Sequence, residues 1–168
     1  MTGGRSMNGI RAKIVLAVLG VVVAAAAVIG GVNGYRYWDD RQAEQSRQDA
    51  VATAGRTLEA MFTYNPQTVD TELRKSADNL TGDFRDDYLT LIDKQIAPGA
   101  KEKQLTVTAT TQAGGVISAD RSHAQVLLFL NQVMTSKDTP QGTTTGSRVR
   151  VTLSKADSHW LVSAVTPV

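Results

Sequence analysis

Hydrophobic residues follow three different patterns along the chain. A continuous apolar run comes first, because residues 14–32 are only Ile, Val, Leu, Ala and Gly. From Val51 to Ile96, apolar residues recur every three or four positions, which is the spacing of amphipathic helices. From Leu105 onward they alternate with polar residues, as in half-buried strands. The sequence therefore predicts a hydrophobic segment, then helices, then a sheet.

The apolar run is long enough to cross a membrane. As a helix, its 19 residues span roughly 28 Å, close to the hydrocarbon core of a bilayer at about 30 Å. The apolar region of a signal peptide is shorter, about 7–15 residues. Aromatic residues typical of a membrane interface follow the run: Tyr35, Tyr37 and Trp38. We expect an uncleaved transmembrane helix over residues 14–35; a leader cleaved near Ala27 is the alternative.

The charges beside this helix favour one orientation. Residues 1–13 contain three basic residues and no acid, which predicts a short cytoplasmic tail. Basic residues also follow the helix, at Arg36, Arg41 and Arg47, so the difference between the two ends is small. The expected arrangement is a single-pass protein of the cytoplasmic membrane, with residues 36–168 outside the cytoplasm.

Small residues within the predicted membrane helix are candidates for helix packing. Gly30 and Gly34 form a GxxxG pair, and Gly20 belongs to a second line of small residues. Small side chains allow two helices to approach closely in lipid. The competing interpretation is that Ala and Gly are simply frequent in membrane helices.

We expect helices across residues 36–97. Asn65-Pro66 would end the first, because the residue before a proline avoids the helical region. Thr68 would cap a second helix. A third would carry apolar residues on one face and end at Pro98-Gly99; that face consists of Phe84, Tyr88, Ile92 and Ile96.

An antiparallel sheet is expected over residues 104–166. Gly114-Gly115 would form a turn, and the apolar segment 124–134 would be a central strand. Trp160 would fill the core from the last strand. Helices followed by an antiparallel sheet indicate an α+β fold. The arrangement resembles the cone-shaped roll of cystatin-like and nuclear-transport-factor-like proteins.

The composition argues against several kinds of function. The chain has no Cys, and its two His lie in no metal-ligand spacing. When residues 1–13 are set aside, 15 basic and 16 acidic residues remain, which gives no reason to expect nucleic acid. No catalytic motif is present, so we expect no enzyme and no cofactor. An Asp120 paired with Tyr64 or Tyr88 inside the cone, as in ketosteroid isomerases, is the one catalytic arrangement to consider.

Four segments carry a family resemblance: "YNPQTVD" (64–70), "LTGDFRDDY" (80–88), "VLLFLNQV" (126–133) and "HWLVSAVTPV" (159–168). With the basic tail and the single membrane helix, they resemble the Mce-associated membrane proteins, which accompany the Mce lipid-import systems of bacterial envelopes. The resemblance implies a non-catalytic accessory subunit that helps to assemble or stabilise such a complex. Its implied partners are the membrane, Mce-type proteins and their permease subunits.

One alternative function stays open, which is a module that binds a lipid or another small hydrophobic ligand in a cavity of the roll. A filled interior would favour the accessory subunit, and an open apolar cavity would favour the binding module. The candidate residues for a pocket or an interface are Asn131, Tyr88 and Trp160, although each also has a structural explanation.

Overall fold

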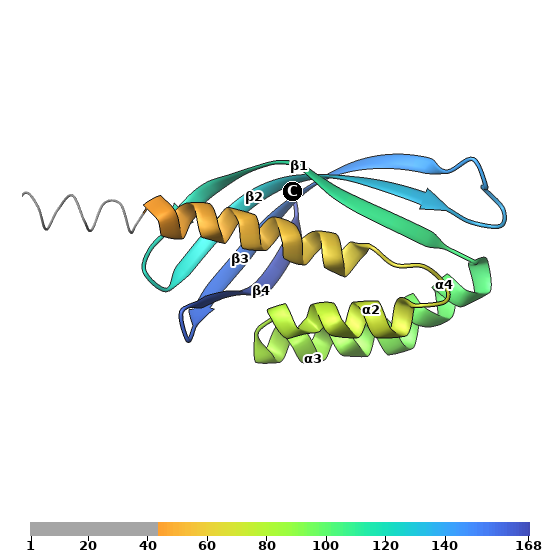
Figure 1. Cartoon of the computed structure of the whole chain (residues 1–168), viewed down its shortest axis with the longest axis horizontal. Coiled ribbons are helices and arrows are strands. Elements are labelled where there is room, and N and C mark those ends of the chain that lie inside the picture. The colour runs from red at the N-terminus through yellow and green to blue at the C-terminus, as the bar shows by residue number, and fades with distance from the viewer. Residues whose placement is uncertain (1–43) are drawn as a thin grey trace, which may run out of the picture. The chain divides into compact units, whose positions relative to one another are not determined.

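The computed structural model describes residues 44–168, which belong to one compact unit. Helices come first along the chain and a four-stranded antiparallel sheet follows (Figure 1). This arrangement confirms the predicted α+β class. The predicted tail over residues 1–13, the membrane helix over residues 14–35, and Gly20, Gly30 and Gly34 lie outside the described residues.

The helical part begins with a helix over residues 44–62, which we call the long helix. One face of this helix is apolar and buried, and its members are Ala50, Ala54, Leu58 and Met61. The later helical segments are α2 (Val69–Ser76), a 3-10 turn (Ala77–Asn79), α3 (Gly82–Leu91), a π-helical stretch (Ile92–Ile96) and α4 (Ala97–Lys103).

Asn65 stabilises the turn that leads into α2, whose N-cap position is Thr68. The Asn65 Oδ1 atom accepts hydrogen bonds from the backbone N–H groups of Gln67 and Thr68, at 2.9 and 3.1 Å. Thr68 occupies the N-cap position, but its side chain makes no capping hydrogen bond. The predicted cap position is therefore right, but the side-chain hydrogen bonds come from Asn65, which satisfies the N–H groups of the turn that follows it.

The predicted helix end at Pro98-Gly99 is wrong, because α4 continues to Lys103. Proline is tolerated in the first turn of a helix, where its missing N–H would have had no partner. The preceding π-helical stretch lets the chain begin a new helix at that point. Gln104 ends α4 instead, with a left-handed backbone at φ 52°.

The sheet is a simple meander in the order β1-β2-β3-β4. The strands are β1 (Thr106–Ala119), β2 (His123–Thr135), β3 (Thr143–Ala156) and β4 (His159–Pro167). The predicted central strand corresponds to β2, which pairs with β1 on one side and β3 on the other. Its alternate residues are buried against the helices: Ala124, Val126, Leu128 and Leu130.

Gly114 allows close packing instead of making the predicted turn. β1 runs through Gly114 and Gly115 without reversing, with irregularities between Thr111 and Ala113 and between Val116 and Ser118. A Cβ atom on Gly114 would lie 2.5 Å from Leu128 Cδ2 and 3.1 Å from Val51 Cγ1. The glycine therefore lets β1 pass close to both β2 and the long helix.

The end of the long helix and the loop after it seal one edge of β1. Three backbone N–H groups of this strand donate hydrogen bonds outward, at 2.7–3.0 Å: Val107 to the Tyr64 carbonyl, Ala109 to Thr63 Oγ1, and Thr111 to Glu59 Oε1. Open strand edges invite pairing with other chains. This half of the edge is closed by residues that precede the sheet by about fifty positions.

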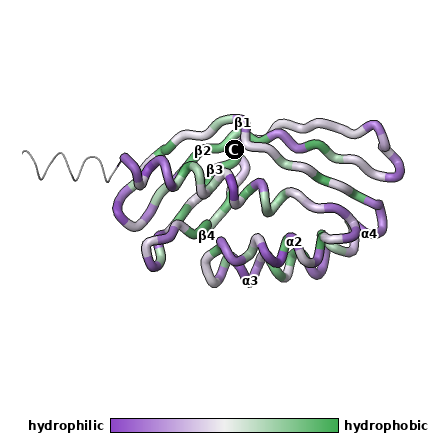
Figure 2. The backbone as a smooth tube through the Cα atoms, in the orientation of Figure 1, coloured by the Kyte–Doolittle hydropathy of each residue, from purple (hydrophilic) through white to green (hydrophobic). Residues whose placement is uncertain are grey.

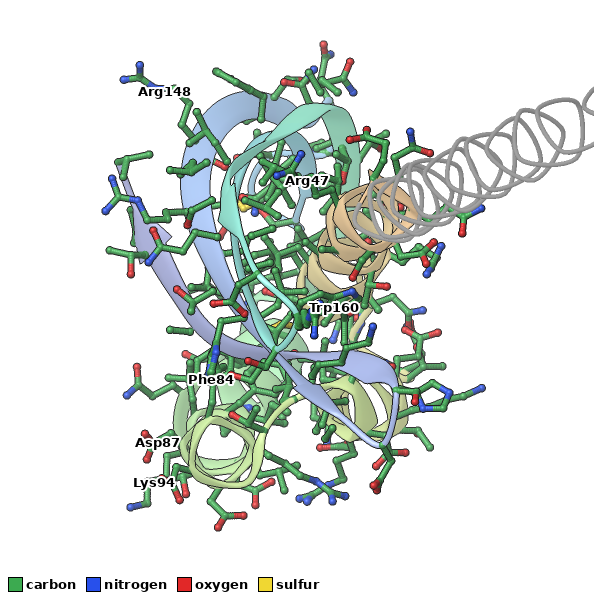
Figure 3. The ribbon with its side chains drawn as sticks, turned by 90° about the vertical axis from the view of Figure 1, so that its left-hand side faces the viewer. Arg47, Phe84, Asp87, Lys94, Arg148 and Trp160 are labelled. Carbon is green, nitrogen blue, oxygen red and sulfur yellow. The ribbon has the colours of Figure 1, made fainter. Side chains whose placement is uncertain are left out.

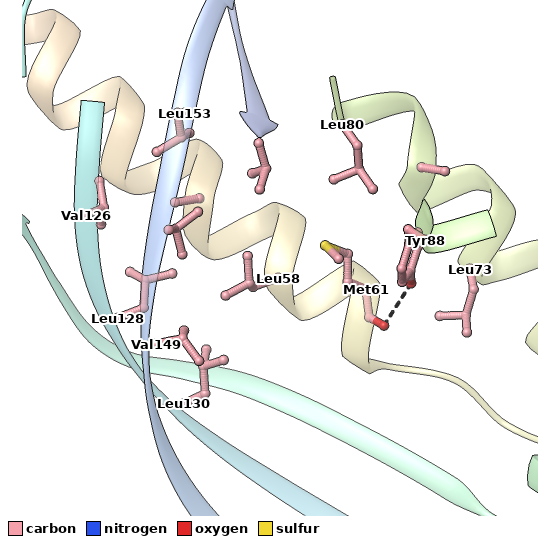
Figure 4. Close-up of a cluster of buried hydrophobic side chains, with 14 of the residues drawn as sticks. Leu58, Met61, Leu73, Leu80, Tyr88, Val126, Leu128, Leu130, Val149 and Leu153 are labelled. Atoms are coloured by element: carbon pink, nitrogen blue, oxygen red, sulfur yellow. Dashed lines mark hydrogen bonds between the residues drawn. The ribbon is translucent and has the colours of Figure 1, made fainter. Parts of the chain in front are cut away.

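Large apolar side chains fill the space between the sheet and the helices (Figure 4). The largest of the completely buried side chains come from both layers: Leu58, Leu73, Ile92, Leu128, Leu130 and Leu153. Each such side chain stabilises the fold by about 1.5–3 kcal/mol relative to exposure. The interior of the roll is therefore a packed core.

Candidate functional site

Tyr88 belongs to this core. Its hydroxyl donates to the Met61 carbonyl at 3.0 Å and lies 3.3 Å from Ser76 Oγ. Burial raises the pKa of Tyr88 to about 12, so the phenol stays protonated under ordinary conditions. Only 5 % of the residue is exposed. Tyr88 joins three helical segments and leaves little surface for a partner.

Trp160 fills the core from β4, as the sequence predicted, and is only 6 % exposed. Its cross-strand neighbour is Lys155, whose Nζ lies 5.3 Å from the centre of the indole ring. This is a cation–π contact at the edge of the core. Trp160 is therefore positioned to hold β4 against the helices.

Asn131 lies on the other side of the sheet and is exposed. It pairs with Thr110 of β1 and Gly146 of β3, in a part of β2 where the pairing is regular. There is therefore no β-bulge at Asn131 for its side chain to satisfy. Its position suits contact with a partner, which stays a prediction.

Asn131 belongs to a surface that we call the open face, the side of the sheet turned away from the helices. β2 contributes Leu127, Phe129, Asn131 and Val133 to it, because these residues alternate with the buried ones. Phe129 is 42 % exposed and Val133 is 44 % exposed. The sequence predicted a central strand here but did not distinguish its two faces, because both faces of β2 are apolar.

The open face carries positive charge only. In β3, Arg148 lies directly opposite Phe129, and Arg150 lies directly opposite Leu127. None of the four strands contains Asp or Glu. Within residues 44–168, neither arginine side chain forms a hydrogen bond or an ion pair. The open face is therefore an apolar strip with two unpaired guanidinium groups beside it.

The catalytic arrangement of Asp120 with a tyrosine is not formed. Asp120 lies in the exposed turn between β1 and β2, where its Oδ1 accepts the N–H groups of Ser122 and His123 at 2.7 Å. These hydrogen bonds hold the pKa of the Asp120 carboxyl below its usual value. Tyr88 instead bonds to Met61 and Ser76. Across residues 44–168 no three His, Asp or Glu side chains are grouped as metal ligands would be.

A hollow of about 520 Å³ lies on the surface beside the end of the long helix and α2. Most of the residues that line it are of polar or charged type, but the wall that they expose is mainly carbon: Ala60, Thr63, Glu72, Lys75, Ser76, Asp78 and Asn79. Among the helices of residues 44–168, none has the length and hydropathy needed to span a bilayer.

Two similar proteins occur in Mycobacterium tuberculosis. The outer membrane protein Rv1973 is 38 % identical over 139 residues, which are 80 % of this chain and 86 % of Rv1973. The uncharacterized protein Rv1362c is 33 % identical over 153 residues, which are 88 % of this chain and 70 % of Rv1362c. No protein-family profile matches the chain. The chain belongs to the family that includes Rv1973 and Rv1362c.

Solved structures show the same fold at low sequence identity. The periplasmic domain of DotI has a TM-score of 0.60 and 19 % identity, and the match covers 70 % of this chain and 91 % of DotI. CagV, a VirB8 homologue of the type IV secretion system of Helicobacter pylori, has a TM-score of 0.56 and 10 % identity, with 70 % and 94 % covered. The described domain therefore has the α+β fold of these domains.

Proposed function

We propose that this protein is a non-catalytic accessory subunit of the cell envelope, and that it assembles or stabilises an Mce-type lipid-import complex. In this proposal a single N-terminal helix anchors it in the cytoplasmic membrane. Its tail is cytoplasmic, and the α+β domain lies outside the cytoplasm. The packed core of the roll is the observation that carries the proposal, because buried apolar side chains occupy the space between the sheet and the helices, and partners would then be bound at the surface.

The comparisons support the envelope part of the proposal. A relative in the same family is named an outer membrane protein. The matched part of DotI is periplasmic, and CagV belongs to a secretion system. A fold that serves as the extracytoplasmic domain of other proteins suits the same location here. The name of Rv1973 raises the outer membrane as the competing location.

The Mce part of the proposal rests on the four quoted segments. In the structure each segment forms part of the fold. Residues 64–70 join the long helix to α2, and residues 80–88 lead into and form most of α3. Residues 126–133 are the middle of β2, and residues 159–168 hold β4. They therefore define a scaffold, and the choice of partner must come from its exposed surfaces.

The alternative of a hydrophobic-ligand module receives less support. The hollow beside α2 is large enough for a small ligand, but Glu72, Lys75 and Asp78 line it. Pockets for hydrophobic ligands are lined mainly by apolar and aromatic side chains. Leu128→Met tests this alternative, because it changes the shape of the core with little change in volume. A binding module would lose lipid uptake while the complex still assembles.

Co-purification in mild detergent, followed by mass spectrometry, tests the proposal. We expect Mce-type proteins and permease subunits to accompany the full chain. Replacing Gly30 and Gly34 with Leu should reduce their recovery, because it prevents close helix approach in the membrane. Val28→Leu with Val32→Leu is the matched control, because these two residues are also four positions apart. At about 100° per residue, they would lie on the side of the predicted helix opposite Gly30 and Gly34.

One result would contradict the proposal, and a second would move the partner contact from the helix to the domain. If the parent chain brings down no transporter subunit, it is not part of such a complex. If the Gly30 and Gly34 variant recovers partners as well as the control does, the helix serves only as a tether. Separation of the two membranes tests the location, since we expect the protein with the cytoplasmic membrane.

A further inference from the structure

The open face exposes apolar residues that the fold itself does not need. Phe129 and Val133 point away from the core, which is complete without them. They lie on β2, an inner strand, so the apolar strip runs along the middle of the face rather than at an edge. Central apolar residues with a polar rim are typical of protein interfaces.

The charges around the strip specify the kind of partner. Arg148 and Arg150 lie beside Phe129 and Leu127 in the pairing of β2 with β3. Figure 3 shows Arg148 extending away from the sheet. Because the strands contain no acidic residue, the charge of these guanidinium groups is not balanced on this face. A matching partner surface would combine an apolar residue with unpaired carboxylates.

The chain itself carries such a surface on α3. Asp83, Asp87 and Leu91 follow one another at four-residue spacing, so they lie along one side of the helix. Leu91 is 41 % exposed. Asp86 adds a third carboxylate, and Lys94 lies just beyond Leu91. We call Asp83, Asp86, Asp87 and Leu91 the acidic face; Figure 2 shows hydrophilic residues along α3.

The carboxylates of the acidic face are free to receive a partner. Other acids of this region are already paired, since Asp78 binds Arg85 and Asp93 binds Arg74. Within residues 44–168, Asp83, Asp86 and Asp87 form no ion pair or side-chain hydrogen bond. The acidic face therefore matches the open face in both charge and exposed apolar residues.

The two faces cannot meet within one molecule. The open face is on the outer side of the sheet, and α3 lies in the helical layer on the other side (Figure 1). In Figure 3, Arg148 and Asp87 lie at opposite ends of the domain. We propose that a second copy of this chain is the occupant, with the open face of one copy docked on the acidic face of the next.

The contact would be heterologous, because two different surfaces meet. Each copy that docks by one face still has its other face free to bind a further copy. Repeated contacts therefore build a ring if they close and an open chain of subunits if they do not. Two open faces would not pair with each other, because four arginines would then be brought together. The association would be independent of which envelope complex the protein serves.

Sedimentation velocity of the full chain in mild detergent, over a range of concentrations, tests the proposal. We expect the parent to form species larger than a dimer as its concentration rises. Arg148→Glu with Arg150→Glu should weaken this association by more than about tenfold, because like charges would face each other. Asp86→Lys with Asp87→Lys should do the same from the other face. Both positions lie beyond the first turn of α3, so the helix start is preserved.

Mixing the two variants gives the sharpest result. Each keeps one working face, and the two reversed faces, one carrying Glu and the other Lys, also complement each other. The mixture should therefore form complexes in which the two variants alternate, while each variant alone associates more than about tenfold more weakly than the parent. Arg56→Glu with Lys103→Glu is the control, since it changes the net charge as much as the arginine variant does but lies on neither face. It should associate like the parent.

Three results would overturn the proposal. The first is a parent chain that stays monomeric at every concentration, which would leave the open face to a different acidic protein. The second is an association that survives both charge reversals. The third is a mixture that associates no better than either variant alone, although circular dichroism shows both variants to be folded.

Discussion

The hydroxyl of Tyr88 donates a hydrogen bond to the carbonyl of Met61, across 3.0 Å. Met61 lies in the last turn of the long helix, where carbonyl groups have no partner within their own helix. Tyr88 supplies that partner from α3, as Figure 4 shows. The phenol of Tyr88 thus satisfies a backbone carbonyl at the end of the long helix and links this helix to α3.

Tyr88→Phe should destabilise the domain. The substitution keeps the ring but removes the only donor that this contact uses, so the buried Met61 carbonyl loses its partner. Leaving such a group unsatisfied costs about 1–3 kcal/mol. Urea unfolding of the isolated domain, residues 43–168, would measure the loss. Tyr64→Phe is the control, because the Tyr64 hydroxyl makes no side-chain hydrogen bond among residues 44–168, and it should change stability by less than about 0.5 kcal/mol.

The same tyrosine makes stability depend on alkaline pH. The pKa of Tyr88 is about 12 in the folded domain, against 10.0 for a free phenol. The folded state therefore keeps a proton that the unfolded state has lost between these values. This contribution is complete below pH 10 and is lost as pH rises through 12, up to about 3 kcal/mol.

A phenolate absorbance titration would check the pH dependence. Residues 43–168 contain two tyrosines, and burial raises the pKa of Tyr64 as well. We expect no ionisation at the ordinary value and a late phase that Tyr88→Phe removes. Two tyrosines that ionise together near pH 10 in the folded domain would contradict the buried hydrogen bond.

The class of fold could be predicted from the sequence because the spacing of apolar residues can be read within each short segment. Residues 51–62 repeat with the period of a helix, and the start of β1 and the second half of β3 alternate as strands do. The turns were harder, because Gly and Pro have more than one use. Gly114 permits close packing rather than reversal, and Pro98 begins a helix rather than ending one. Only the neighbouring elements decide between these uses, and they are distant in sequence.

Gly114→Ala should destabilise the domain by creating a steric clash. Gly115→Ala should create no such clash. A methyl group on Gly114 would overlap Leu128 and press on Val51, while one on Gly115 would meet no atom within 4 Å. Overpacking of this kind costs about 1–3 kcal/mol. Thermal unfolding of the two variants would measure the difference. Equal melting temperatures would show that Leu128 can move aside without loss.

Trp160→Ala should remove much of the stability of the domain. The side chain is almost completely buried, and truncating a buried Trp to Ala costs about 3–5 kcal/mol. Trp160→Phe should lose less, because it keeps a ring in the core. Denaturant unfolding of both variants would rank them. An unchanged midpoint for Trp160→Ala would mean that the packing of β4 does not depend on this residue.

The candidate interaction surface was only partly foreseeable. Asn131 was noticed because a polar residue stood in an apolar strand. Its neighbours Phe129 and Val133 gave no signal, since apolar residues at both alternations of β2 fit a strand buried on both sides. The signal that could have revealed them is in β3: Arg148 and Arg150 alternate with buried valines, and a strand beside them must share their solvent-facing side.

The order of elements also determines when this domain can fold during synthesis. The hydrogen bond between the Thr111 N–H and the Glu59 carboxylate cannot form until Thr111, 52 residues after Glu59, has been synthesised. At about 5–20 residues per second that interval is roughly 3–10 s, and the last strand is made later still. For all of this time the helices present their apolar faces with no sheet to cover them. A truncation that removes β4, and with it the buried Trp160 and Val162, should therefore be degraded rather than accumulate as a partly folded domain.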